Sequence, residues 1–146
     1  ENTYKDSQYF EMPVEVKVGD DLLQEAVPRL VKIDVEGAEV GVLKGISKLI
    51  DRYRRLIVVE YIPQHSSRFG SSFEDIRSIA HEHFYKIYKL GYAKISGGYD
   101  CSLVQVQDSQ VDEPCDVLLG YIEDPFIQGI QDRPVGTQML QASNGR

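Results

Sequence analysis

Three carboxylates stand where an α/β protein would place its ligand. Asp34 and Glu36 come at the end of a β-branched segment, 29–35, and Glu60 stands near the end of the next apolar segment, 56–62. If both segments are parallel strands, their carboxyl ends meet at one edge of the sheet, which is where open α/β sheets bind ligands. Carboxylates there can act as a general base, bind a cationic cofactor or coordinate a metal ion.

Structural roles compete with each of these assignments. An acid beside a helix start, as Glu36 would be, is stabilised by the helix dipole by about 0.3–1 kcal/mol without any ligand. Lys32 shares a strand face with Asp34, so it either pairs with that carboxylate or steers an anionic substrate group. Asp34 and Glu60 both follow apolar runs, so a structural role would have to offset their desolvation. Because magnesium needs few protein ligands, the three acids also leave a magnesium site open.

The histidines add one further candidate. His65 lies in the polar loop 63–72, just after Glu60, and is a candidate base or substrate contact. His81 and His83 would point about 200° apart on a helix, so they cannot share a metal ion. We therefore predict ordinary surface or rim roles for these two.

Three glycines, Gly37, Gly41 and Gly45, recur at every fourth residue. That spacing places them on one stripe of a helix and predicts a close approach of the helix backbone to the sheet. Gly37, at the helix start, would in addition let a ligand approach the backbone.

The predicted elements alternate between strands and helices. Such alternation is typical of a three-layer αβα fold with right-handed crossovers, and the last two strands, which no helix separates, are expected to pair antiparallel at a sheet edge. Gly91 is expected to end the second long helix, and Gly97-Gly98 to form a hairpin turn. The expected strands are 13–18, 29–35, 56–62, 92–96, 101–106 and 116–122, and the expected helices are 38–54 and 73–90.

Composition argues against several classes of protein. The 146 residues suit one α/β domain, 1–122, followed by a polar C-terminal tail, 123–146. A net charge of −7 disfavours nucleic-acid binding, which needs clustered Lys and Arg, and no apolar run is long enough to predict a membrane span. Cys101 and Cys115 form no CxxC pair, so free thiols and a reducing, cytoplasmic compartment are expected. The chain contains no GxGxxG, GxxxxGKS/T or HExxH motif.

The stretch LVKIDVEGAEVGVLKG, residues 30–45, resembles the central motif of the FkbM-type family of S-adenosylmethionine-dependent methyltransferases. Its flanks are similar to the family pattern as well: VEVKVGDDLL before it, LIVVEY after it and KLGY further on. The resemblance therefore spans about residues 14–121. One departure is Gly19-Asp20-Asp21, where the family has Thr-Leu-Asp.

The resemblance implies a Rossmann-like methyltransferase sheet, of which this chain would hold the C-terminal βαβαββ portion. It implies S-adenosylmethionine as cofactor and methyl transfer to a hydroxyl of a sugar, lipid or similar small-molecule acceptor. It gives catalytic roles to the three rim acids and sets Asp34 and Gly37 beside the cofactor, with no metal ion. Lys32 and His65 are then the candidates for contact with the substrate.

Two features predict that the chain is incomplete. The family's D-x-G-x-N-x-G cofactor loop does not occur in it, and about 30 residues precede Val31, too few for three βα units. The chain alone is therefore expected to be inactive. The alternative is a non-catalytic remnant or interaction domain, whose exposed strand edge pairs with a second copy or with the missing N-terminal half.

Overall fold

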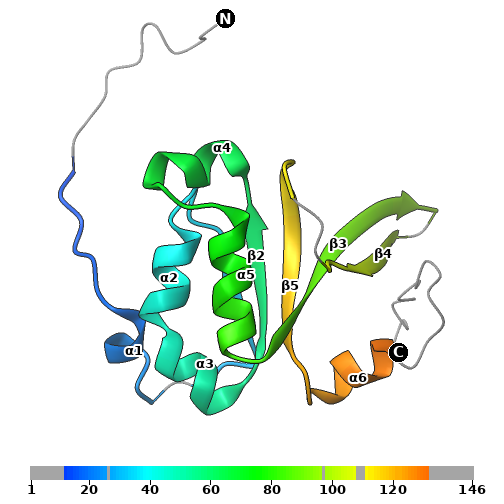
Figure 1. Ribbon diagram of the computed structural model, residues 1–146, viewed down its shortest axis with the longest axis horizontal. Coiled ribbons are helices and arrows are strands. Elements are labelled where there is room, and N and C mark those ends of the chain that lie inside the picture. Colours follow the sequence, from blue (N-terminus) through cyan, green and yellow to red (C-terminus); the bar gives the residue numbers. More distant parts are fainter. Residues whose placement is uncertain (1–11, 26, 97, 108–110, 132–146) are drawn as a thin grey trace, which may run out of the picture.

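One mixed β-sheet with helices organises the described part of the chain. The computed structural model describes residues 12–25, 27–96, 98–107 and 111–131 (Figure 1). The strands are β1 (Leu30–Ile33), β2 (Leu56–Tyr61), β3 (Tyr85–Ile95), β4 (Gly98–Gln105) and β5 (Cys115–Tyr121). The helices are α1 (Gly19–Leu22), α2 (Glu39–Gly45), α3 (Ser47–Tyr53), α4 (Pro63–Ser66), α5 (Phe73–Glu82) and α6 (Pro125–Gln131), with a 3₁₀ turn, η1 (Ser67–Phe69).

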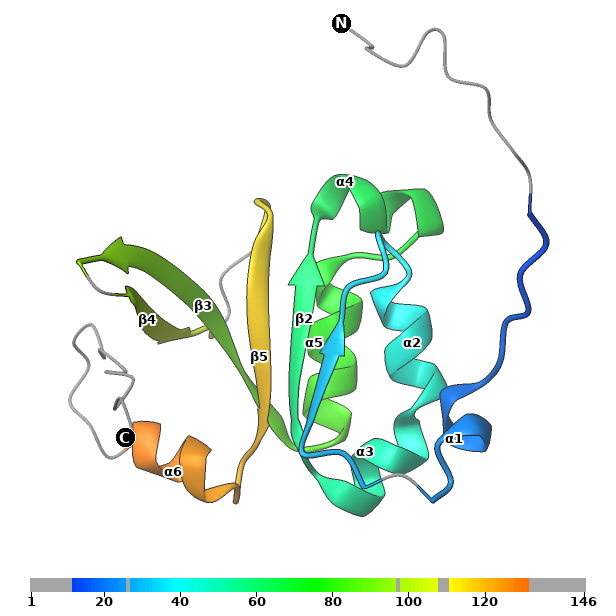
Figure 2. The same ribbon diagram turned by 180° about the vertical axis from the view of Figure 1, so that it is seen from behind.

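Helices α2, α3 and α5 cover one face of the sheet, and α6 lies on the other (Figures 1 and 2). Because side chains alternate along a strand, each face has its own apolar cluster. The larger cluster includes Ile33 and Val59 of the sheet and Leu43 and Ile76 of the helices. The smaller one surrounds Ile127 of α6. The predicted α/β class is confirmed.

Strand β5 lies in the middle of the sheet. The order is β1-β2-β5-β3-β4, with β1 parallel to β2, and β5 antiparallel to both β2 and β3. The predicted hairpin of β3 and β4 is confirmed by their antiparallel pairing, although Gly97 lies outside the described residues. The expected edge position of the last strand is wrong, because Val117, Leu118 and Leu119 are buried on both faces, as suits a central strand.

The predicted helix 73–90 ends at Glu82, and β3 begins soon after it. Phe84 marks the change: its φ is 62° and its side chain is 67% exposed, so it takes no part in a helical stripe. The prediction failed because apolar residues at 84, 87 and 90 have helical spacing, whereas the aromatic and β-branched residues among them favour a strand. Gly91, expected to end the helix, lies inside β3, where a Cβ would overlap the hydroxyl of Ser102.

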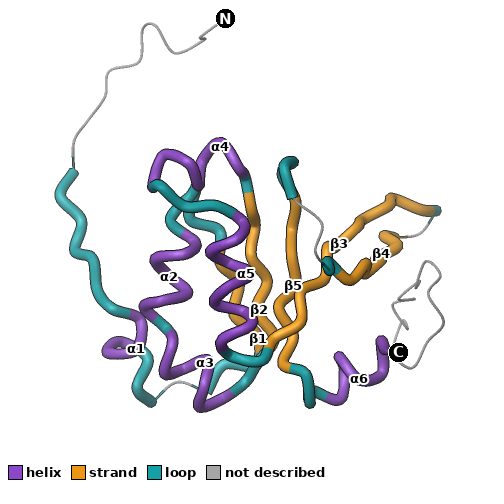
Figure 3. The backbone as a smooth tube through the Cα atoms, in the orientation of Figure 1, coloured by secondary structure: helices purple, strands orange, loops and turns teal. Residues whose placement is uncertain are grey.

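Residues 12–18 are extended and lead into α1 without forming the strand predicted for 13–18 (Figure 3). Val14, Val16 and Val18 are all exposed. Alternation of apolar and charged residues predicts a strand, but a strand also needs a neighbour to complete its hydrogen-bond ladder. In the described structure this segment has no such neighbour.

Asp20 of α1 fixes the start of α3. Its Oδ2 accepts a hydrogen bond from the backbone N–H of Lys48 at 3.0 Å, and its Oδ1 accepts one from Leu49 at 2.9 Å. A helix start leaves such N–H groups without partners inside the helix, so the carboxylate caps α3 from a distant part of the chain. Within the departing segment Gly19-Asp20-Asp21, Asp20 therefore has a structural role.

The predicted helix 38–54 is two helices, α2 and α3, which meet at residue 46. Apart from its chain neighbours and the backbone of α2 itself, Gly41 has no described heavy atom within 4 Å of where a Cβ would stand, and Gly45 has one ordinary contact at 3.7 Å. The predicted close approach of these two glycines to the sheet is wrong, because α2 turns Val40 and Leu43 toward the core instead.

His83 is buried between α5 and α3, so the surface role predicted for it is wrong. Its Nδ1 lies 2.6 Å from Oδ1 of Asp51, and its Nε2 lies 3.5 Å from Oγ of Ser47. The three residues have the order of a hydrolase triad, but the two backbone N–H groups that follow Ser47 are already bonded to Asp20. Donors that could stabilise an oxyanion are thus engaged, and the set serves to join two helices.

Replacing His83 by alanine should lower the free energy of unfolding by about 1–3 kcal/mol, since it removes both side-chain contacts of a buried ring. Chemical denaturation followed by circular dichroism would measure the loss. The exposed His81 provides the matched control, and its alanine variant should stay within about 0.5 kcal/mol of wild type. Equal stability of the two variants would contradict the bridging role.

Helix α6 lies beyond residue 122, where the sequence suggested that a polar tail begins. Ile127 is fully buried, and a Cβ on Gly120 of β5 would overlap its side chain. The first part of the predicted tail therefore packs on the sheet. Residues 132–146 lie outside the described residues.

Cys115 begins β5. Its thiol is free, and burial raises its pKa, which disfavours the thiolate at neutral pH. The side chain of Cys101, the other predicted free thiol, lies outside the described residues.

Candidate active site

The ends of β1 and β2 bring Lys32, Asp34 and Glu60 together. The parallel register pairs Ile33 with Val59, so the residues that follow, Asp34 and Glu60, lie side by side. The Nζ of Lys32 lies 2.6 Å from Oδ2 of Asp34, which confirms the ion pair considered from the sequence. Asp34 also shares a hydrogen bond with Glu60.

The two carboxyl groups differ in charge behaviour. The hydrogen bond from Lys32 and the hydrogen bond with Glu60 hold the pKa of Asp34 below its usual range. The hydrogen bond with Asp34, burial and the negative charges of Asp34 and Asp116 raise the pKa of Glu60. Two neighbouring carboxyl groups do not easily ionise together, so Asp34 ionises first and Glu60 loses its proton at a higher pH than Asp34 does.

A second set of predicted residues meets at the loops that follow the two strands, at the same end of the sheet (Figure 2). The Oε2 of Glu36 lies 2.6 Å from Nδ1 of His65, which belongs to α4. Glu36 and Gly37 have φ angles of 55° and 113°, and the second of these strongly favours glycine. A Cβ on Gly37 would stand 2.6 Å from the carbonyl carbon of His65 and closer still to its oxygen. The two loops are therefore in direct contact.

Glu39 is an acid at this end of the sheet that the sequence did not single out. It is 2% exposed, yet it carries a carboxylate with two partners. Its Oε1 accepts a hydrogen bond from the N–H of Gly37 at 2.8 Å, and its Oε2 accepts one from Oγ of Ser66 at 3.4 Å. The sequence signal that could have pointed to Glu39 is an acid at the first position of a helix, two residues after a glycine in a turn.

The predicted rim residues therefore form two sets. Among the described contacts none joins the Lys32, Asp34 and Glu60 set to the pair of Glu36 and His65. Nor do the described residues contain a group of three or more His, Cys, Asp or Glu side chains that could hold a metal ion. The magnesium alternative thus has no assembled ligand set in this part of the chain.

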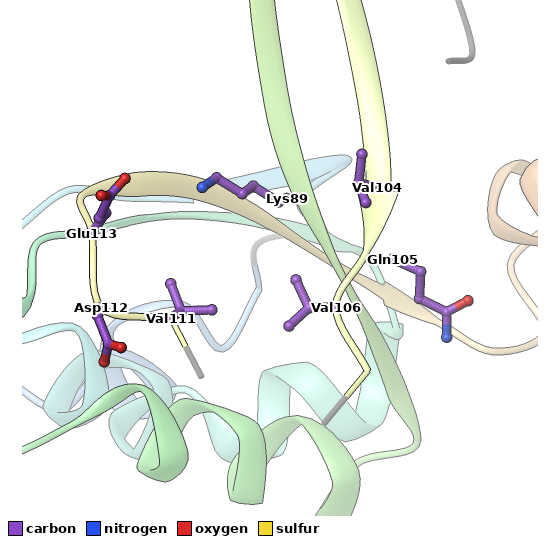
Figure 4. Close-up of a pocket in the computed structure, with 7 residues that line it drawn as sticks. All are labelled: Lys89, Val104, Gln105, Val106, Val111, Asp112 and Glu113. Atoms are coloured by element: carbon purple, nitrogen blue, oxygen red, sulfur yellow. The ribbon is translucent and has the colours of Figure 1, made fainter. Parts of the chain in front are cut away.

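Two hollows flank residues 111–113. Tyr61 lines one of these hollows, and its neighbour Glu60 faces the opposite side of the sheet, because successive residues of a strand point to opposite faces. The carboxyl pair thus does not line either hollow. The first hollow, of about 390 Å³, has three valines and three charged residues in its lining (Figure 4), which consists of Lys89, Val104, Gln105, Val106, Val111, Asp112 and Glu113. The second, of about 400 Å³, is lined by Tyr61, Ser72, Phe73, Glu74, Arg77, Val111 and Asp112.

A family model described as the Methyltransferase FkbM domain matches residues 1–87. The matched region holds β1, β2, helices α1 to α5 and every residue predicted for the site. The chain belongs to the FkbM methyltransferase family. The resemblance noted in the sequence is thereby confirmed. Most of β3 and all of β4, β5 and α6 lie beyond the matched residues of the FkbM domain.

The other comparisons add no relative. No curated protein and no solved structure matches the chain. In the residues that the structure describes, no helix is long and apolar enough to cross a membrane. The family assignment therefore rests on the FkbM domain match together with the geometry of its motif.

Proposed function

We propose that this FkbM domain takes part in transfer of a methyl group from S-adenosylmethionine to a hydroxyl oxygen of a sugar, lipid or similar acceptor. The observation that carries the proposal is the Asp34 and Glu60 carboxyl pair at the ends of adjacent parallel strands. Bound S-adenosylmethionine supplies an electrophilic methyl group on a sulfonium cation. The protein has to orient the acceptor oxygen and remove its proton.

The pair divides these tasks. Glu60, with its raised pKa, is the stronger base of the two once it has lost its proton, so it accepts the proton of the acceptor hydroxyl. Asp34, held charged by Lys32, orients that hydroxyl by accepting a hydrogen bond. The sequence-based prediction gave catalytic roles to Asp34, Glu36 and Glu60 without dividing the tasks among them. Lys32 serves mainly to keep Asp34 charged. Its contribution to substrate binding is made through its ion pair with Asp34.

In this proposal Glu36 and His65, whose side chains lie 2.6 Å apart at the same end of the sheet, contact the acceptor. The carboxylates suit the cationic sulfonium end of S-adenosylmethionine, because opposite charges attract. The adenosine end needs a loop of the D-x-G-x-N-x-G kind, which this sequence does not contain. We infer that the sheet is the C-terminal part of a Rossmann-like methyltransferase sheet and that Gly37 lies close to the cofactor.

The proposed reaction is tested by the fate of the methyl group. A complete FkbM domain that carries this rim should move label from methyl-labelled S-adenosylmethionine to an acceptor oxygen, and mass spectrometry of the product locates the new methyl group. Methylation at nitrogen or carbon alone would contradict the proposal.

The chain by itself should bind S-adenosylmethionine weakly, with a dissociation constant of roughly 1 mM or above. The sequence lacks the family loop that would hold the adenosine, so most contacts to the cofactor are missing. Isothermal titration calorimetry measures the affinity directly. Micromolar binding to this chain would refute the proposal that half of the cofactor site is absent.

A second candidate function is that of an interaction domain, and the free edge of β1 favours it. In the described structure β1 pairs with β2 alone, and Leu30 at its start is 53% exposed. An open strand edge with exposed apolar side chains is a site where another chain can add a strand. Sedimentation velocity should then show a dimer at about 100 µM, a concentration at which weak pairing is populated. A monomer at that concentration speaks against pairing between copies.

A further inference from the structure

Glu39 connects the two loops that form the rim. One loop, residues 34–38, follows β1, and the other, which begins with α4, follows β2. One oxygen of Glu39 bonds to Gly37 in the first loop, and the other bonds to Ser66 in the second. Ser66 is itself 1% exposed, so both hydrogen bonds lie in the interior.

The first loop needs such support, because its backbone is strained. Non-glycine residues rarely adopt the positive φ that Glu36 has here, and they do so at a cost of about 1–3 kcal/mol where the surroundings hold them. The N–H of Gly37 points to Glu39, and its Cα lies against the carbonyl of His65. The hydrogen bond and the contact together fix the turn.

Ser66 holds the second loop through hydrogen bonds within that loop. Its carbonyl accepts hydrogen bonds from the N–H and the Oγ of Ser71, both at 3.1 Å, and its own N–H bonds to Ile62 at 3.0 Å. The hydroxyl is then left to bond with Glu39. His65 precedes Ser66, so the backbone from which its ring extends is fixed together with Ser66.

We propose that Glu39 is a positioning residue that sets Glu36 against His65 by bridging the two loops. The inference rests on the proposed function only where it calls Glu36 and His65 acceptor contacts. Its geometric content is independent of any reaction. Glu39 itself is buried, so it reaches neither cofactor nor acceptor.

The chemistry of the bridge selects the variants. In Glu39→Gln the amide oxygen can still accept from Gly37, and the amide nitrogen can donate to the hydroxyl of Ser66, so the bridge survives without charge. In Glu39→Ala both partners lose their acceptor. Ser66→Ala removes the second hydrogen bond alone and leaves the first in place.

Two NMR measurements on the chain report on the bridge. Amide exchange at Gly37 reports on its hydrogen bond to Glu39, and the ring chemical shifts of His65 report on its contact with Glu36. We expect exchange at Gly37 in Glu39→Ala to be about tenfold or more faster than in wild type. We expect its His65 ring shifts to move to those of Glu36→Ala, whereas Glu39→Gln keeps both wild-type values.

The outcomes separate positioning from mere stabilisation. A residue that only stabilises the fold would lower the melting temperature without moving either signal, and wild-type values in Glu39→Ala would overturn the proposal. So would a Glu39→Gln variant that behaves like Glu39→Ala. If Glu39→Ala does not fold, Ser66→Ala decides: His65 shifts should move while exchange at Gly37 is unchanged, and unmoved His65 shifts reject the bridge. Absence of methyl transfer would leave all these results intact.

Discussion

A Gly37→Ala variant should unfold roughly 6–12 °C below wild type, which corresponds to about 3 kcal/mol for a chain of this size. Two effects add. Alanine is strained at a φ of 113°, and its Cβ would overlap the backbone carbonyl of His65. A carbonyl held in α4 cannot turn aside as a flexible side chain can. Differential scanning calorimetry would measure the shift.

The control is Gly41→Ala, four residues further along the same motif. Gly41 is exposed in α2, and apart from its chain neighbours and the helix's own backbone no described heavy atom lies within 4 Å of the place that an alanine Cβ would take. Alanine there should stabilise the protein by about 0.5–1 kcal/mol through its higher helix propensity. Similar melting temperatures for the two variants would show that the contact between the rim loops is not tight.

Replacing Glu60 by glutamine should lower kcat of a complete FkbM domain carrying this rim by about 10²-fold or more, the usual contribution of a general base. Glutamine keeps the shape of the side chain and its ability to form hydrogen bonds but cannot accept the proton. Steady-state methyl transfer at saturating substrates would measure the effect. Full turnover in this variant would remove Glu60 from the mechanism.

The pH dependence supplies the matched test. The pKa of Glu60 is raised, so as the pH is lowered its proton-accepting form should be lost at a higher pH than for an ordinary glutamate. The rate of methyl transfer should therefore begin to fall at that higher pH. Asp116→Asn removes one of the charges that raise this pKa, and should move the acid limb to lower pH. An acid limb that stays in place in Asp116→Asn would point to another base.

The rim could be predicted from the sequence because it depends on local order. Two apolar strands separated by a helical stretch have to run parallel, so their ends meet, and the acids that follow them, Asp34 and Glu60, meet too. Glu36 and His65 come together for the same reason, since their loops follow those strands. The FkbM domain match then shows that these residues lie in a domain of a methyltransferase family.

What could not be predicted depends on partners distant in sequence. Asp20 caps a helix 28 residues away, and His83 reaches Ser47 across 36 residues, which no local pattern encodes. Glu39 looks like an ordinary first-turn acid until Ser66 is placed beside it. The start of β3 was missed because apolar spacing there fits both a helix and a strand.

The position of β5 decides how the sheet can be completed. Strands β2 and β3 are not hydrogen-bonded to each other, because β5 lies between them and pairs with both. Until Cys115–Tyr121 has been synthesised, no strand is available to join the pair β1 and β2 to the hairpin β3 and β4. Closure therefore waits for contacts between residues far apart in sequence, which slows folding. During that interval β2 presents an open edge, and a growing chain is then most exposed to mispairing.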